Sequence, residues 1–135
     1  MTDEVYEMLN EPKQIRSQIR MVNDEIEALE LSMLPGCIRY DKDKVQVSPE
    51  DPMAKFAEKL DDLETKRSIL RERYLTAHNR VVMAAEKLAP DEGEVIVMRY
   101  LLGLRIAAIA KDLGKSERQI MRDCKSAEEK IQNVT

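Results

Sequence analysis

Hydrophobic residues recur at alternating steps of three and four along the first part of the chain, residues 5–33, and polar side chains separate them. This period is that of one face of an α-helix that packs along a partner helix. Pro12 occupies one of these positions, so the helix either begins near Pro12 or has an earlier segment that kinks there. The positions are Val5, Met8, Pro12, Ile15, Ile19, Val22, Ile26, Leu29 and Met33.

The same period returns in residues 53–88 and predicts a second long helix. Its N-cap is either Ser48 or Asp51, because each is followed by a proline that suits the first helical turn. The Ala89–Pro90 step ends it. Its hydrophobic face consists of Met53, Phe56, Leu60, Leu63, Leu70, Tyr74, Ala77, Val81, Ala84 and Leu88, with Arg67 as the single charge among them.

These two stripes predict an antiparallel helical hairpin over residues 1–89, similar to a coiled coil. The segment between them, residues 34–52, contains three prolines and a glycine and permits the chain to reverse. In a hairpin each helix buries only one of its faces against the other helix. We therefore expect further hydrophobic surface to be buried by self-association or by packing on the C-terminal unit. We call the line along which the two stripes meet the seam. Arg67 either extends from the edge of this seam into water, or it contacts a partner and sets the register in which the helices pair.

Three shorter helices are predicted in residues 90–135. Asp91 is a candidate N-cap for the first of them, which Gly103 ends, and the second runs from Arg105 to Leu113. Gly114 lies in the turn that follows, and Ser116 then caps the third helix, with Gln119 completing a capping box. The second and third helices are thus joined by a short turn that contains a glycine, which is the arrangement of a helix-turn-helix. Its buried positions are Ile106, Ile109, Ala110, Leu113, Ile120, Cys124, Ala127 and Ile131.

The outward face of the third helix carries the candidate chemistry. The N-terminal half of such a helix enters the major groove of DNA, and arginine is the best single reader of guanine. The structural alternative is a three-helix bundle whose charged face is only solvated. The candidate DNA-binding residues are Lys115, Ser116, Arg118, Gln119, Met121, Arg122 and Lys125.

Composition and charge agree with this interpretation. Charged residues are 36% and aromatic residues 4% of the 135 residues, a balance that favours an all-α fold and disfavours β-sandwiches and barrels. The net charge is −4, but residues 99–135 hold eight Lys and Arg against five Asp and Glu. A basic C-terminal third on an acidic body is an electrostatic pattern that suits nucleic acid.

Several functional classes are disfavoured. The two cysteines, Cys37 and Cys124, lie far apart, the single histidine, His78, falls outside the seam, and the sequence has no glycine-rich phosphate loop. We therefore expect no enzyme, no catalytic residues, no metal site and no cofactor. His78 is expected to be exposed and without a structural role. No apolar run approaches membrane-spanning length and no signal peptide is visible, so we expect a cytoplasmic protein without a membrane partner.

The C-terminal residues resemble region four of bacterial sigma factors. The likeness rests on Val95–Tyr100, Gly103-Leu104, Ile109-Ala110, Leu113-Gly114, Ser116 and Ile120. The whole chain is similar to small phage late-gene regulators of the ArpU and RinA type, in which a Val-Gln-x-Ser-Pro segment precedes such a unit. Here that segment is Val45–Pro49, and Arg118 and Arg122 fit the family's S-x-R-x-hydrophobic-x-R pattern. The chain departs from the family at Ile106–Ala108, where a tryptophan and a Lys-Glu pair are common.

The resemblance implies a transcription regulator that binds double-stranded DNA and has RNA polymerase as a candidate partner, with a homodimer formed through the hairpin as a further possibility. Two alternatives from other classes stay open. A DNA-packaging subunit similar to a small terminase also combines a helix-turn-helix with a coiled-coil element, and it would form a ring of many subunits. A structural coiled-coil interaction protein would bind no DNA.

Overall fold

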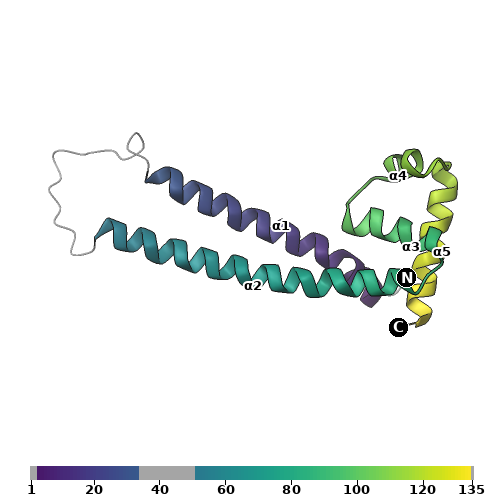
Figure 1. Ribbon diagram of the computed structural model, residues 1–135, viewed down its shortest axis with the longest axis horizontal. Coiled ribbons are helices and arrows are strands. Elements are labelled where there is room, and N and C mark those ends of the chain that lie inside the picture. Colours follow the sequence, from purple (N-terminus) through teal and green to yellow (C-terminus); the bar gives the residue numbers. More distant parts are fainter. Residues whose placement is uncertain (1–2, 34–50, 135) are drawn as a thin grey trace. The chain divides into compact units, whose positions relative to one another are not determined.

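The computed structural model describes residues 3–33 and 51–134, and all regular structure within these ranges is helical. The predicted all-α fold is therefore confirmed. Contacts divide the chain into two compact units, one formed by Ser17–Arg71 and the other by Met1–Arg16 with Glu72–Thr135. The elements in Figure 1 are α1 (Asp3–Ser32), α2 (Pro52–Glu86), α3 (Pro90–Ile96), the π-helical segment η1 (Val97–Leu101), α4 (Ile106–Leu113) and α5 (Glu117–Val134).

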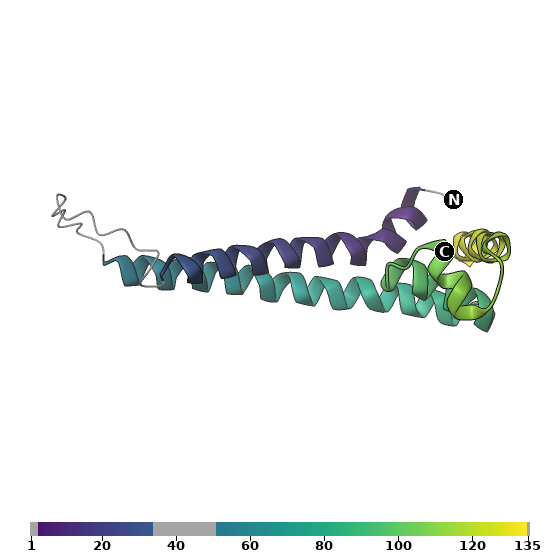
Figure 2. The same cartoon turned by 90° about the horizontal axis from the view of Figure 1, so that it is seen from above.

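In the unit Ser17–Arg71, α1 and α2 lie side by side and antiparallel, which confirms the predicted hairpin (Figures 1 and 2). Val22, Ile26 and Leu70 are buried between the helices. Arg67 Nη1 donates a hydrogen bond of 3.1 Å to Asn23 Oδ1 on the facing helix. Arg67 therefore makes a contact across the seam within one chain.

The predicted stripe of the first helix is buried or half-buried at every position. Pro12 lies inside α1, so the helix does not begin near Pro12 but has nine residues before it, from Asp3. In α2 the stripe is buried or half-buried except at Met53, which is 58% exposed. Met53 stands in the first turn of α2, where no described residue covers it.

The N-terminus of α2 is capped by Asp51, one of the two predicted candidates. Asp51 Oδ1 accepts a 3.0 Å hydrogen bond from the Met53 amide, and Pro52 is the first helical residue. The other candidate, Ser48, lies outside the described residues, as do Cys37, the Val45–Pro49 segment and most of the predicted loop 34–52.

The end of α2 is earlier than predicted, at Glu86 instead of Ala89. Ala89 has an extended conformation with ψ 147°, because a proline disfavours the helical region for the residue before it. The predicted division between residues 89 and 90 coincides with the step from α2 to α3, and as a domain boundary it stays a prediction.

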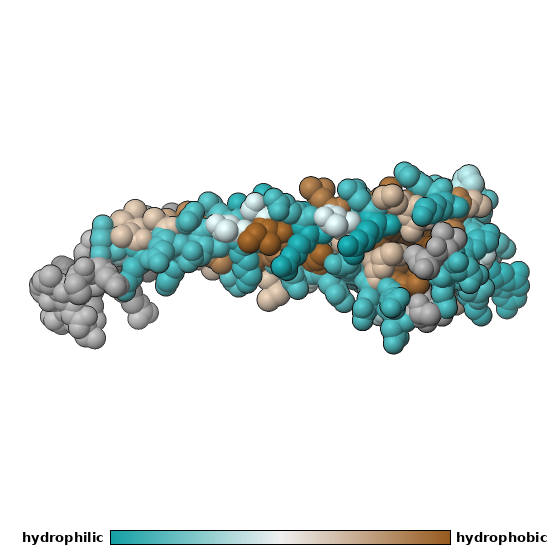
Figure 3. All heavy atoms as spheres, turned by 90° about the horizontal axis from the view of Figure 1, so that it is seen from below, coloured by the Kyte–Doolittle hydropathy of each residue, from teal (hydrophilic) through white to brown (hydrophobic). Residues whose placement is uncertain are grey.

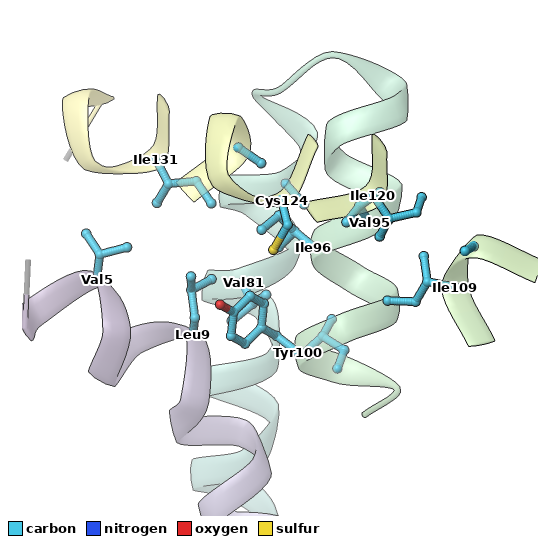
Figure 4. Close-up of a cluster of buried hydrophobic side chains, with 14 residues drawn as sticks. Val5, Leu9, Val81, Val95, Ile96, Tyr100, Ile109, Ile120, Cys124 and Ile131 are labelled. Atoms are coloured by element: carbon cyan, nitrogen blue, oxygen red, sulfur yellow. The ribbon is translucent and has the colours of Figure 1, made fainter. Parts of the chain in front are cut away.

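A single hydrophobic core holds the unit formed by Met1–Arg16 and Glu72–Thr135 together (Figure 4). The N-terminal turns of α1 contribute Val5 and Leu9 to it, which matches the expectation that part of the hairpin packs on the C-terminal unit. The remaining buried residues come from α2 to α5: Val81, Ala85, Val95, Ile96, Tyr100, Leu101, Ile109, Ala110, Ile120, Cys124, Ala127 and Ile131.

Gly93 allows α3 to approach the end of α2 closely. A Cβ atom at this position would lie 2.6 Å from the backbone oxygen of Ala85, a separation that real Cβ atoms essentially never show. The neighbouring atom is backbone and cannot rotate away. Glycine is therefore required here for close packing, although its backbone conformation is helical.

The first C-terminal helix differs from its prediction at both ends. Pro90 is its first residue, and Asp91 lies in the first turn instead of forming the N-cap. The helix then widens into η1, where the Leu102 amide donates to the Val97 oxygen at 3.1 Å. Gly103, at φ +70°, ends it as predicted. The Arg16 guanidinium donates a hydrogen bond to the Leu101 carbonyl, which satisfies one acceptor at this helix end.

On the face drawn in Figure 3, hydrophilic residues surround separate hydrophobic patches. No helix in residues 3–33 and 51–134 has the length and hydropathy needed to span a membrane.

Candidate nucleic-acid interface

The turn between α4 and α5 is fixed by its backbone. Gly114 adopts the left-handed conformation with φ +66°, and the amides of Gly114 and Lys115 both donate to the Ala110 oxygen, the latter at 3.0 Å, which closes the C-terminus of α4. Ser116 Oγ then accepts a 3.2 Å hydrogen bond from the Gln119 amide and caps α5. The predicted helix-turn-helix is therefore present, with α5 as its second helix.

One half of the predicted capping box is not formed. The Gln119 side chain donates a 2.9 Å hydrogen bond to Asp123 Oδ1 instead of returning to the Ser116 amide. Asp123 lies one turn further along α5, and its carboxylate oxygen is within reach of the Gln119 side-chain N–H.

The inner face of α5 packs firmly on the core (Figure 4). Ile120, Cys124, Ala127 and Ile131 are all buried, as the sequence predicts. From α4, Ile109 and Ala110 are buried in the same cluster. This packing determines which side chains of α5 face outward.

A cluster of polar side chains lies beside this core and adds side-chain contacts between η1 and α5. Glu128 Oε1 accepts hydrogen bonds from the Tyr100 hydroxyl and, at 3.3 Å, from the Cys124 thiol. Arg99 Nη1 donates to Cys124 Sγ at 2.9 Å, and its guanidinium lies 5.6 Å from the centre of the Tyr100 ring. These contacts join η1 to the middle of α5.

Burial makes the two weak acids of this cluster harder to ionise. It raises the pKa of the Cys124 thiol from 9.0 to about 11, against the opposing effect of the Arg99 guanidinium. Burial and the hydrogen bond to Glu128 also raise the pKa of Tyr100. Both groups are hydrogen-bond donors at neutral pH, and a buried neutral thiol is a poor nucleophile.

The far half of α5 is tied to α3 through Glu92. Its Oε1 atom accepts hydrogen bonds from Lys130 Nζ at 2.8 Å and from Ser126 Oγ at 3.1 Å. The Glu92 side chain is only 15% exposed, whereas that of Lys130 is 52% exposed, so only the carboxylate end of this ion pair is shielded from solvent.

A shallow concavity lies on the outward side of α5. Four of the seven predicted DNA-binding residues line it: Arg118, Met121, Arg122 and Lys125. All four are exposed. The same concavity contains residues that the sequence analysis did not assign to the interface, namely Arg99, Ile106, Glu117 and Glu128. Arg99 and Ile106 belong to other helices, and only the tertiary packing brings them to α5.

The other three predicted residues are placed differently. Ser116 caps the helix, and Gln119 is bonded to Asp123. The Lys115 amine lies 3.5 Å from Asp123 Oδ2 and 3.8 Å from Asp91 Oδ2, so two carboxylates already neutralise it. Their contact with DNA stays a prediction.

His78 and the acidic residues of the described ranges form no grouped metal site. His78 is half-buried, contrary to the expectation of an exposed residue, and its ring lies 5.6 Å from that of Tyr74. Within residues 3–33 and 51–134, no three His, Cys, Asp or Glu side chains are grouped so that they could hold a metal ion.

The C-terminal part of the chain matches a known family. Residues 78–130 match the family described as Sigma-70, region 4, and this range extends from the last turns of α2 to the end region of α5. The searches of curated proteins and of solved structures gave no match. The C-terminal part of the chain is thus a sigma-region-four-like helix-turn-helix, a kind of domain with which transcription regulators bind DNA.

Proposed function

We propose that this chain is a phage-type transcription regulator, similar to the ArpU and RinA proteins, and that it reads duplex DNA with the outward face of α5. The observation that carries the proposal is the group of exposed cations Arg118, Arg122 and Lys125, which line one concavity on the second helix of a helix-turn-helix. The family match over residues 78–130 supports it.

Arg118, Arg122 and Lys125 lie at increasing distances from the N-terminus of α5. Arg118 is the second residue of the helix, and Arg122 follows one turn later on the same side. Residues near the start of a recognition helix reach base edges, whereas later ones approach the phosphates. We therefore assign base reading to Arg118 and a phosphate contact to Lys125.

The same proposal includes protein partners. The sigma-like unit favours RNA polymerase as a partner, and the hairpin offers a surface for a homodimer or for docking on that partner. A homodimer would read two half-sites related by two-fold symmetry. The proposed location is the cytoplasm, where DNA and polymerase are accessible.

The test starts with selection of bound sequences from a random duplex pool by the full chain. Arg118→Ala, Lys125→Ala and the control Arg73→Ala, an exposed arginine on α2, are then titrated with the selected and a scrambled duplex at two salt concentrations. Arg118→Ala should cost about 1–3 kcal/mol on the selected duplex and relax preference at one position.

Lys125→Ala should weaken binding to both duplexes alike and reduce the salt slope by about one. Arg73→Ala should bind as the parent does. If the folded Arg118→Ala and Lys125→Ala variants both bind as tightly as the parent, α5 does not contact DNA and the proposal is wrong.

A further inference from the structure

Met121 is an exposed hydrophobic residue in the middle of a charged surface. Its side chain is 60% exposed, although its neighbours along α5, Ile120 and Cys124, are almost completely buried. It shares the concavity with the cations Arg118, Arg122 and Lys125. No described side chain covers it.

The concavity combines an apolar centre with cations at its edge. Met121 and the half-buried Ile106 of α4 supply the apolar surface, and the cations of α5 stand beside it. Such a surface suits a ligand that carries anionic groups on both sides of an apolar one. The major groove of DNA has this character, because phosphates border it and the C5-methyl groups of pyrimidines project into it.

We propose that Met121 recognises the C5-methyl group of a pyrimidine in the major groove. This inference rests on the proposed DNA binding by α5 and adds the chemical feature of the base that the helix reads. Thymine carries this methyl group in all DNA, and 5-methylcytosine carries the same group at the same position. Methionine suits the contact because its unbranched thioether is polarizable and adapts to the groove surface.

Position along α5 supports the assignment. Met121 comes three residues after Arg118 and precedes Lys125 by one turn. Met121 therefore lies in the N-terminal part of α5, the part of a recognition helix that contacts base edges. Glu117 and Glu128 also line the concavity, and Glu128 Oε1 already accepts hydrogen bonds from the Tyr100 hydroxyl and the Cys124 thiol.

The experiment removes or adds single methyl groups in the DNA. The probe is the duplex that the wild-type full chain selects from a random pool, synthesised with each thymine replaced in turn by deoxyuridine and, separately, each cytosine by 5-methylcytosine. Affinities are measured by fluorescence anisotropy at one fixed salt concentration. Loss of the recognised methyl group should weaken wild-type binding about fourfold, the effect of one buried methyl group.

Two variants separate the methyl contact from other effects. Met121→Ala should bind the methylated and unmethylated forms of that position with equal affinity. Met83→Ala, a control with the same 60% exposure on α2, should retain the wild-type ratio. Thermal melting followed by circular dichroism checks that both variants are folded.

The outcomes are distinct. An effect of deoxyuridine at one position identifies thymine as the ligand, and a gain with 5-methylcytosine identifies the modified base. If no replacement changes wild-type affinity, or if Met121→Ala keeps the wild-type ratio, the methyl assignment is wrong, whereas DNA binding by the chain is still shown by the selected duplex. If the wild-type chain selects no duplex, the proposed function fails and this inference fails with it.

Discussion

Gly93 shows how a single residue sets the distance between two helices. Within a helix, replacement of glycine by alanine ordinarily stabilises a protein by about 1 kcal/mol. Here a Cβ atom would lie 2.6 Å from the Ala85 oxygen, so α3 would have to move away from α2. We expect Gly93→Ala to lower the free energy of unfolding by about 1–3 kcal/mol, measured by urea denaturation.

Glu94→Ala is the matched control, because Glu94 is the next residue of α3 and is exposed. It should change the stability by no more than about 0.5 kcal/mol. A Gly93→Ala variant that is as stable as the parent, or more stable, would show that the close contact between α3 and Ala85 is not present in solution.

The buried acids Cys124 and Tyr100 predict a loss of stability at alkaline pH. The folded state raises the pKa of Cys124 from 9.0 to about 11, so the unfolded chain releases this proton first as the pH rises. The stabilisation is fully present below pH 9.0 and is lost as the pH approaches 11. Tyr100, whose pKa is also raised, contributes in the same direction at still higher pH.

Urea denaturation at a series of pH values measures this loss. Cys124→Ala and Tyr100→Phe should each make the stability less dependent on pH in the alkaline range. Equal alkaline slopes in the parent and in both core variants would contradict the role assigned to this cluster.

At the scale of elements, the hairpin depends on burial along one narrow seam. Val22 is 2% exposed between α1 and α2, and its neighbour Met21 is 62% exposed. Val22→Asp should lower the stability of the hairpin by about 2–5 kcal/mol, because an unpaired charge would be buried in the seam. Met21→Asp, a change to the same residue one position away, should be nearly neutral. Urea denaturation followed by circular dichroism compares the two, and similar stabilities would contradict the seam.

The elements that the sequence predicts well are those with a long hydrophobic period. The stripes of α1 and α2 are buried or half-buried as their spacing indicates, except at Met53, and Gly103 and Gly114 end their helices as predicted, because both effects are local. The π-helical turn at η1 and the burial of Leu9 outside the seam could not be predicted in this way. The π-helical turn and the burial of Leu9 both depend on how η1 and α1 pack on the core. The spacing of hydrophobic residues along the sequence does not contain that information.

The same distinction holds for the candidate site at the scale of the whole molecule. The outward positions of α5 follow from helical spacing, so Arg118, Met121, Arg122 and Lys125 could be predicted from the sequence. Arg99 and Ile106 join them only because η1 and α4 pack against α5. The neutralisation of Lys115 by Asp91 and Asp123 likewise depends on the tertiary fold.

The measurement that tests the account most directly is titration of the ¹⁵N-labelled full chain with its selected duplex, followed by NMR. The account predicts the largest amide shifts between Arg118 and Lys125 on α5, with smaller changes at Arg99 and Ile106 and little change in Ser17–Arg71. The claim that α5 reads DNA would be contradicted if DNA binding shifted the amide resonances of Ser17–Arg71 and left those of Arg118–Lys125 unchanged.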